Sequence, residues 1–402
     1  MMFSRSVISQ VSCVVKAQKY TGLILLGLIF LPGLSQSAAW QLRPTIVVEE
    51  RVQDNIKMKP EESSIAHETV FQGVLGFRRF SETSNVEGRA HVDLSTERSS
   101  RHFSTINAFK KFTLSTIGLG ALYRRENLGI DDSDELDASD EVGNPNSDNV
   151  MRNSLKLDPY WQRRLNERTT LDLNFGFENV FYENDSGSNE KYSDFTKQSI
   201  SPSLVRQLSE RDVILATFSV SRYRADNSKN TEGDSYELSL GYKTSFSERT
   251  KWGISGGVRH TITDDDTLDE AKSSQGFVMQ ANMNAKFELT NVNVRVKRNL
   301  IPSGSGGWLE VNDLGANMNH KFRPRLFGTF SMRLTQKEIV DGTNYEKRYN
   351  FRASPRIGWK MTQWWALSMG YKHIRREIEN STDDAANNIL FLQVRYSKGI
   401  AI

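Results

Sequence analysis

Long stretches in which apolar and polar residues alternate one by one constrain this chain more than any other feature of its sequence. In Tyr349–Lys360, one face carries Ile357 and Trp359, and the other face carries Arg352 and Arg356. A strand with one face against a soluble core also alternates, but seldom for about 12 residues or more. Alternation of this length, repeated along the chain, is typical of strands that cross a membrane as part of a β-barrel.

A short polar motif recurs between the alternating segments. Its three strongest copies are Trp161–Thr169, Leu204–Asp212 and Tyr242–Thr250, and its weaker copies are Phe77–Thr83 and Lys321–Arg325. Each copy separates two alternating segments, which predicts a tight turn at the end of a β-hairpin. Longer polar connections lie between successive hairpins, and the acidic stretch 129–149 is the longest of them.

These signals predict an all-β chain folded as a transmembrane antiparallel β-barrel. We expect strands to begin near residues 42, 66, 85, 102, 113, 150, 169, 194, 212, 235, 251, 275, 291, 308, 325, 346, 364 and 388. That gives 18 strands, with 16 as the alternative count because the turns between residues 97 and 126 are ambiguous. An even count places both ends of the barrel on the rim of the short turns, the periplasmic rim of such proteins. A barrel of this size encloses a water-filled lumen.

The first 39 residues have the organisation of a cleaved signal peptide. Arg5, Lys16 and Lys19 precede an apolar run of about 11 residues, which is too short for a membrane-spanning helix. Small residues at Ser37–Ala39 predict cleavage after Ala39. We therefore expect residues 1–39 to be a signal peptide and residues 40–402 to be the outer-membrane barrel of a Gram-negative bacterium, a location that also implies contact with membrane lipid and lipopolysaccharide.

Charge and cysteine content exclude several kinds of function. The three basic residues of the signal segment account for the net charge of +3, so the remaining chain is neutral and does not favour nucleic-acid binding. The single cysteine, Cys13, lies in the same segment, so the mature chain has no disulfide and no thiolate metal site.

No catalytic, metal or cofactor motif stands out. The six histidines, among them His67 and His373, have no zinc-ligand spacing, and no nucleophile elbow or phosphate loop occurs in a suitable context. We expect no enzymatic activity, no catalytic residue, no metal site and no cofactor.

Basic residues concentrate on the polar face of the C-terminal strands. Placing the apolar face against lipid sends one basic set into the lumen: Arg295, Lys297, Lys321, Arg333, Arg352, Arg356, Lys360, Lys372 and Arg395. Asp313, Glu288 and Lys286 join them, and the N-terminal half is more balanced. A charge facing lipid would cost about 2–4 kcal/mol at midplane, so a lumen is its natural place. Two interpretations follow: an anion-preferring conduit, or a lumen in which the two walls neutralise each other.

Aromatic residues near strand ends predict belts at the two membrane interfaces. The predicted belt residues are Tyr160, Trp161, Phe181, Tyr182, Trp252, Trp308, Trp359, Trp364 and Trp365.

The mature N-terminus, Trp40–Asn55, ends in an Asp-Asn pair and resembles the opening strand of the putative β-barrel porin 2 family. The Ser-Glu-Arg-Thr turns also resemble that family, and the resemblance covers essentially the whole mature chain. It implies an outer-membrane barrel associated with exopolysaccharide systems, and no catalytic residue. The last strand departs from many such barrels because the chain ends on Ile402 rather than on an aromatic residue.

The resemblance and the basic lumen lead to three functional hypotheses. The first is a component of exopolysaccharide export across the outer membrane, with polysaccharide and periplasmic export proteins as partners. The second is a diffusion porin for small, preferably anionic solutes. The third is a structural or adhesive surface protein that acts through its loops.

Overall fold

The computed structural model describes the chain in ten ranges: residues 40–55, 65–96, 101–127, 150–183, 192–226, 230–264, 271–302, 308–339, 347–379 and 384–401. Within those ranges, no helix is long and apolar enough to cross a membrane. The predicted signal peptide and the acidic stretch 129–149 lie outside the described residues.

Eighteen long strands and one short strand make up the fold. They are β1 (Trp40–Gln53), β2 (Ala66–Phe80), β3 (Ser84–Ser95), β4 (Arg101–Lys111), β5 (Ser115–Asn127), β6 (Met151–Arg164), β7 (Thr169–Glu183), β8 (Phe195–Gln207), β9 (Asp212–Ala225), β10 (Glu232–Ser245), β11 (Thr250–Asp264), β12 (Lys272–Lys286), β13 (Thr290–Pro302), β14 (Trp308–Lys321), β15 (Leu326–Ile339), β16 (Lys347–Lys360), β17 (Trp365–Ile378), β18 (Ala385–Ser397) and β19 (Ile400–Ala401).

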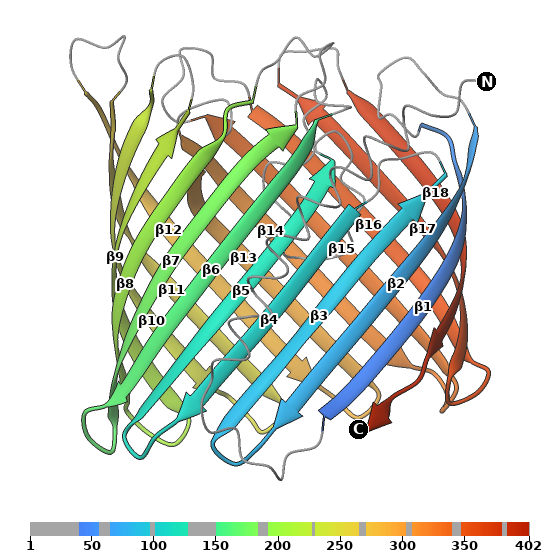
Figure 1. Cartoon of the computed structure of the whole chain (residues 1–402), viewed down its shortest axis with the longest axis horizontal. Coiled ribbons are helices and arrows are strands. Elements are labelled where there is room, and N and C mark those ends of the chain that lie inside the picture. The colour runs from blue at the N-terminus through green and yellow to red at the C-terminus, as the bar shows by residue number, and fades with distance from the viewer. Residues whose placement is uncertain are drawn as a thin grey trace.

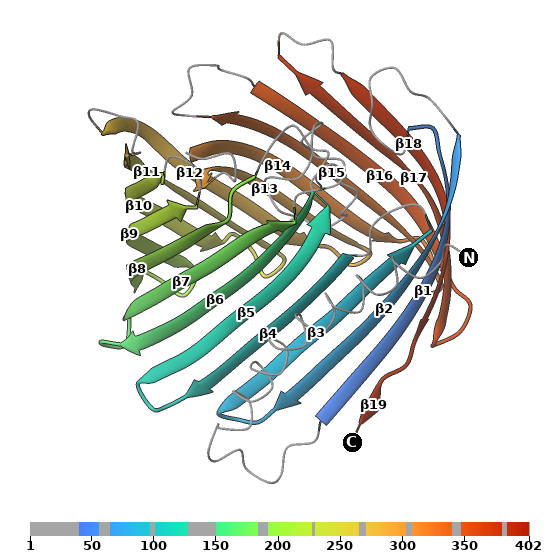
Figure 2. The ribbon, with the colours of Figure 1, turned by 45° about the horizontal axis from the view of Figure 1, so that its top comes forward.

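The strands close into a single antiparallel barrel. Each strand from β1 to β17 pairs with the next one along the chain, and β1 pairs with β18 from Thr45↔Ser397 to Gln53↔Ile389. The two-residue β19 extends this closing pair at Leu42↔Ile400. Figure 1 shows the tilted strands side by side, and Figure 2 shows them running around a ring in which β1 meets β18. The predicted fold class and the count of 18 long strands are therefore confirmed, and the alternative count of 16 is wrong.

The predicted strand starts agree with the structure to within three residues. The region between 97 and 126 holds two strands, β4 and β5, joined by the turn at 112–114. Lys110 and Lys111 end β4 instead of forming a turn. Alternation was sufficient for this agreement because each strand is long enough to carry many in-out repeats.

Pairing divides every strand into an outward and an inward face, since antiparallel partners point to the same side of a sheet. The outward face carries exposed apolar side chains, such as Ile46, Leu238, Leu240 and Met369. In soluble proteins an exposed apolar surface of this extent would be costly, whereas lipid accepts it. The outer face therefore has the character of a membrane-embedded surface.

Tight turns join the strands along one rim, as the sequence repeat predicted. The hydroxyl of Ser209 accepts hydrogen bonds from the backbone N–H groups of Arg211 and Asp212, both at 3.1 Å. Ser247 and Thr362 accept equivalent bonds in their own turns. Short polar side chains that bind backbone two or three residues ahead stabilise such turns. This requirement explains why a polar residue recurs at the same place in the motif.

Both ends of the barrel lie on the rim of the tight turns. Trp40, the first residue of β1, pairs with Arg79, which lies next to the turn at 81–83. Near the end of β18, Tyr396 pairs with Trp365, which follows the turn at 361–364. Figure 1 shows the C-terminal end on this lower rim. That this rim is periplasmic stays a prediction.

Three outward-facing prolines interrupt ladders that are otherwise continuous. The β6–β7 ladder is broken at Pro159, the β8–β9 ladder at Pro202 and the β16–β17 ladder at Pro355. Proline has no backbone N–H to donate, so the neighbouring strand loses a partner there. All three prolines occupy similar offsets before the tight turns that follow their strands.

The face assignment can be tested with adjacent residues of β10. Leu238→Arg places a charge on the outward face, where we expect the free energy of unfolding in lipid vesicles to fall by about 2–4 kcal/mol. Ser239→Arg, one residue along and on the inward face, is the matched control and is expected to change it much less. Urea unfolding of both variants in the same vesicles provides the measurement. A larger loss for Ser239→Arg would reverse the assignment.

Candidate functional site

The register places the whole predicted basic set on the inward face of β13 to β18. The inward basic residues of these strands, here called the basic wall, are Arg295, Lys297, Lys321, Arg333, Lys337, Arg348, Arg352, Arg356, Lys360, Lys372, Arg376 and Arg395. Along the same face of the described strands, Asp313 is the one carboxylate. Lys286 also faces inward, whereas Glu288 lies in the turn at 287–289 instead of on a wall. That the wall lines a conducting pore stays a prediction.

Asp313 organises part of the basic wall. Its two carboxylate oxygens accept from Arg333 at 2.5 Å and from Arg295 at 3.3 Å, and the hydroxyl of Thr335 donates to it at 3.1 Å. Asp313 is buried, and a buried carboxylate requires partners of this kind. Arg295 and Arg333 are therefore ion-paired residues of the wall.

Other members of the predicted set form no ion pair. Lys297, Lys321, Arg356, Lys360 and Arg395 lie more than 4.0 Å from every carboxylate of the described chain. Arg356 donates a hydrogen bond to a neutral partner, the hydroxyl of Thr329, at 3.1 Å. These residues therefore form no ion pair with a described side chain, although the charge of Lys297 acts on the Glu237 carboxylate of β10.

The opposite wall pairs its carboxylates locally. Arg51 bridges Glu49 at 2.5 Å and Glu68 at 3.4 Å, all three on β1 and β2. Further along, Arg101 donates to Asp93 at 3.0 Å between β4 and β3.

Arg152 of β6 repeats this arrangement, with Glu126 at 3.5 Å and Glu178 at 3.3 Å. Each of these carboxylates is engaged by an arginine on the same or a neighbouring strand. Such local pairing favours a net basic interior over two walls that neutralise each other.

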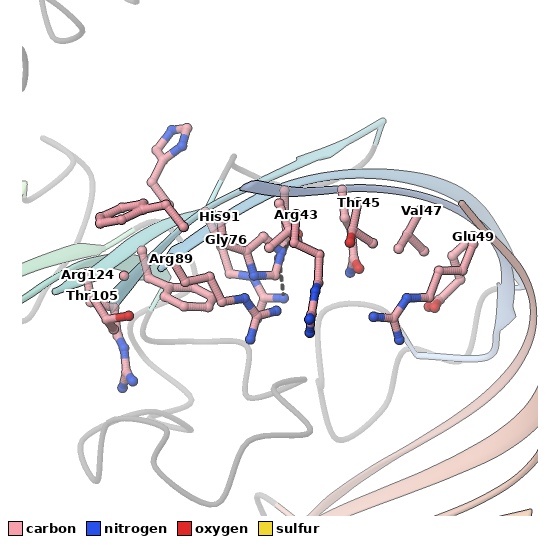
Figure 3. Close-up of a pocket in the computed structure, with 18 of the residues that line it drawn as sticks. Arg43, Thr45, Val47, Glu49, Gly76, Arg89, His91, Thr105 and Arg124 are labelled. Carbon is pink, nitrogen blue, oxygen red and sulfur yellow. Dashed lines mark hydrogen bonds and ion pairs between the residues drawn. The ribbon is translucent and has the colours of Figure 1, made fainter. Parts of the chain in front are cut away.

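A cavity of about 1010 Å³ lies between the first and last strands of the barrel. It is lined by β1 to β5 on one side and by β16 to β18 on the other, so it spans the closing pair. Figure 3 shows Arg43, Arg89 and Arg124 reaching in from the N-terminal strands, and Arg356 and Arg395 line it from the C-terminal strands. Nine arginines line the cavity in total, together with four carboxylates: Glu49, Glu87, Asp93 and Glu126.

The arginines of the N-terminal side were not among the predicted site residues. Arg43 and Arg89 belong to strands that alternate clearly, and the outward Ile46 and Val92 fix their parity. The signal that could have found them was therefore present in the sequence. The charges of the N-terminal half, taken together, predict a more balanced wall, and that average conceals the arginines of β1 and β3.

The end of the β13–β14 hairpin, residues 298–302 and 308–310, lies on the lumen side of the wall formed by β9 to β11. The β12–β13 ladder stops at Met279↔Arg298, although β13 and β14 remain paired to Pro302↔Trp308. Trp308 occupies the same face of β14 as the exposed Met318, yet it is 1% exposed. The hairpin end therefore packs its outer face against the inner face of neighbouring strands.

Specific contacts hold this hairpin end. The ring of Trp308 lies 5.7 Å from that of the inward-facing Tyr223, centroid to centroid. Glu310 bridges Arg298 of its own hairpin at 2.5 Å and the buried Arg259 of β11 at 3.1 Å. These contacts narrow the interior at the rim opposite the tight turns.

Part of the predicted aromatic belt is wrong. Trp308 and Tyr182 are buried in a cluster with Phe195 and Tyr223 on the inward side, and Tyr160 also faces inward, against Gly118. Alternation gives the face of Tyr160 and Tyr182 directly. For Trp308, however, the outward parity is correct and the burial comes from the inward position of the hairpin end, which local sequence does not encode.

The described residues hold no cluster of three or more His, Cys, Asp or Glu side chains that could hold a metal ion. Absence of enzymatic activity and of cofactors stays a prediction.

Comparison with known proteins agrees with the resemblance found in the sequence. The family described as "Putative beta-barrel porin 2" matches residues 219–398, which confirms the resemblance over β10 to β18 and part of β9. None of the curated proteins matches the chain in sequence. The closed barrel, its apolar outer face and the family match together indicate an outer-membrane β-barrel.

Solved structures that are similar to this chain include proteins of two bacteria. OpdQ and OpdK of Pseudomonas aeruginosa are each 10% identical to it with a TM-score of 0.45; the alignments cover 92% and 90% of this chain, and 100% and 99% of those proteins. OccAB4 of Acinetobacter baumannii is 11% identical with a TM-score of 0.44, over 92% of this chain and 100% of its own.

The ion pairs of the hairpin end give a stability prediction. Glu310→Gln leaves the buried Arg259 without its carboxylate, and breaking a buried pair in this way is expected to lower the free energy of unfolding by roughly 3 kcal/mol. Glu232→Gln is the matched control, since its pair with Arg224 is exposed and should contribute little. Urea unfolding in lipid vesicles measures both. Equal losses would contradict the buried bridge.

Proposed function

We propose that this chain, whose residues 219–398 match the putative beta-barrel porin 2 family, is a diffusion porin that favours small anionic solutes. The observation that carries the proposal is the basic wall, which faces the interior with Asp313 as its one described carboxylate. Basic side chains in a confined aqueous passage raise the local concentration of anions and lower that of cations. Solutes with negative charge would therefore enter and cross more readily.

Local pairing on the N-terminal side supports the same proposal. A carboxylate already bound to an arginine of its own wall contributes little field across the lumen, because the two charges largely cancel at a distance. Glu49, Asp93 and Glu126 are all in this position. Within the predicted basic set, Lys297, Lys321, Arg356, Lys360 and Arg395 are then the residues whose charge no described ion pair cancels.

The narrowed interior also favours small solutes over a polymer. At one rim, the β13–β14 hairpin end lies on the lumen side of the wall. The cavity, of about 1010 Å³, has the size of sites that hold small molecules. Exopolysaccharide export, the first hypothesis from the sequence, rests mainly on the family resemblance and secondarily on the basic lumen, and it stays a prediction. The structural or adhesive role stays a prediction as well. We expect the barrel to sit among outer-membrane lipid and lipopolysaccharide with its tight turns in the periplasm.

Ion selectivity tests the proposal directly. In planar bilayers with a KCl gradient, we expect a reversal potential that indicates preference for chloride over potassium. The triple variant Arg352→Gln, Arg356→Gln and Lys372→Gln should move the permeability ratio toward one, because it removes three inward charges. Arg211→Gln, in an exposed turn, removes a charge outside the lumen and should leave the ratio unchanged.

A cation-selective or non-conducting barrel would contradict the porin proposal. In that case, loss of surface polysaccharide in a strain lacking the gene, restored by wild type, would favour the export hypothesis.

A further inference from the structure

Three arginines that line the cavity have no ion-pair partner among the described residues: Arg43 of β1, Arg356 of β16 and Arg395 of β18. The charges of Arg356 and Arg89 act on Arg395, so guanidinium groups from both sides of the closing pair repel one another there. Like charges gathered in a confined space destabilise one another unless a counter-charge is bound between them. The four carboxylates that line the same cavity are paired with other arginines, as Glu49 is with Arg51 and Asp93 with Arg101, so a bound anion is left to supply the counter-charge.

The backbone leaves room for such an anion. Gly76 of β2 pairs with Arg43 on one side and with Arg89 on the other, and all three face inward. A Cβ atom at Gly76 would meet nothing closer than Arg43, at 3.7 Å. Figure 3 shows Gly76 between the side chains that project from β1 and β3. Because Gly76 has no side chain, nothing projects from the wall between Arg43 and Arg89 at this position.

Uncharged polar groups complete the lining. Gln41, Gln72, Thr105 and Asn107 face the same cavity and can bind the oxygens or hydroxyls of a polar molecule. The guanidinium group presents two parallel N–H donors that match the two oxygens of a carboxylate. One monocarboxylate would compensate one arginine, whereas the cavity joins three.

We infer that the cavity is a saturable binding site for a small organic anion with at least two carboxylate groups, bound by Arg43, Arg356 and Arg395. This deepens the proposed function, because the anion reaches the site through the lumen. General anion preference needs only the field of the basic wall. A saturable site needs these three side chains in particular, so the two can fail separately.

Succinate is the probe, with acetate as the monocarboxylate control. In planar bilayers containing the purified full chain, we expect added succinate to reduce the chloride current along a saturating curve. Acetate at the same concentration should reduce it far less. An equal effect of the two acids, or a succinate effect that never saturates, would overturn the inference while the chloride preference measured without succinate stands.

Arginine variants locate the site. Arg356→Gln and Arg395→Gln should each raise the half-blocking succinate concentration about tenfold, as expected for loss of a charge-assisted hydrogen bond. Arg395→Lys keeps the charge but not the planar fork and should have a smaller effect. Arg249→Gln, in the turn at 246–249, is the matched control and should have no effect.

Gly76→Leu tests the space without changing any charge. It should also raise the half-blocking concentration of succinate, because its side chain enters the cavity. Unchanged blocking in both arginine-to-glutamine variants would overturn the assignment to this cavity. Stronger block by inorganic phosphate than by succinate would overturn the carboxylate class.

Discussion

Pairing of β1 with β18 is the constraint on which the rest of this molecule depends. Lipid offers no hydrogen-bond partner to an open sheet edge, so a sheet can cross a membrane only when its last strand returns to its first. Nine register pairs, from Thr45↔Ser397 to Gln53↔Ile389, make that return. Closure then fixes two faces for every strand, and a slip by one residue would exchange the apolar outer face for the charged inner one.

Closure also brings together residues from opposite ends of the chain. The cavity lies at this junction, so Arg43 of the first strand and Arg395 of the last share one space. Elsewhere the inner charges differ between the walls. On the N-terminal strands, Glu49, Asp93 and Glu178 are paired with arginines, whereas Asp313 is the one inward carboxylate on the described residues of β13 to β18. Unequal distribution of the acids, more than the total charge of the chain, gives the interior its sign.

Most of the fold could be predicted from the sequence because alternation and turn chemistry are local. A ten-residue window of β16 fixes which of its side chains face lipid, and a serine such as Ser209 marks a turn by binding its own backbone. Ion pairing could not be predicted in the same way. Whether Asp313 binds Arg333 or another cation depends on register between strands and on side-chain geometry.

The inward hairpin end shows the same limit. Trp308 follows the outward parity of β14, and only the early end of the β12–β13 ladder buries it. The cavity was missed because it needs β1 and β18 side by side. Both the burial of Trp308 and the cavity depend on how strands distant in sequence lie in space, which no single strand encodes.

Where the β12–β13 ladder ends early, the barrel wall is held together without backbone hydrogen bonds between neighbouring strands. Between Lys272 and Val278, β12 has β11 on one side but no hydrogen-bonded ladder to β13 on the other. Two side-chain contacts with the hairpin end replace backbone pairing there. Arg298 stacks on Phe277, and Glu310 bridges Arg259. Cohesion of the wall at this place therefore depends on side-chain chemistry, and substitutions there act on the barrel wall itself as well as on its interior.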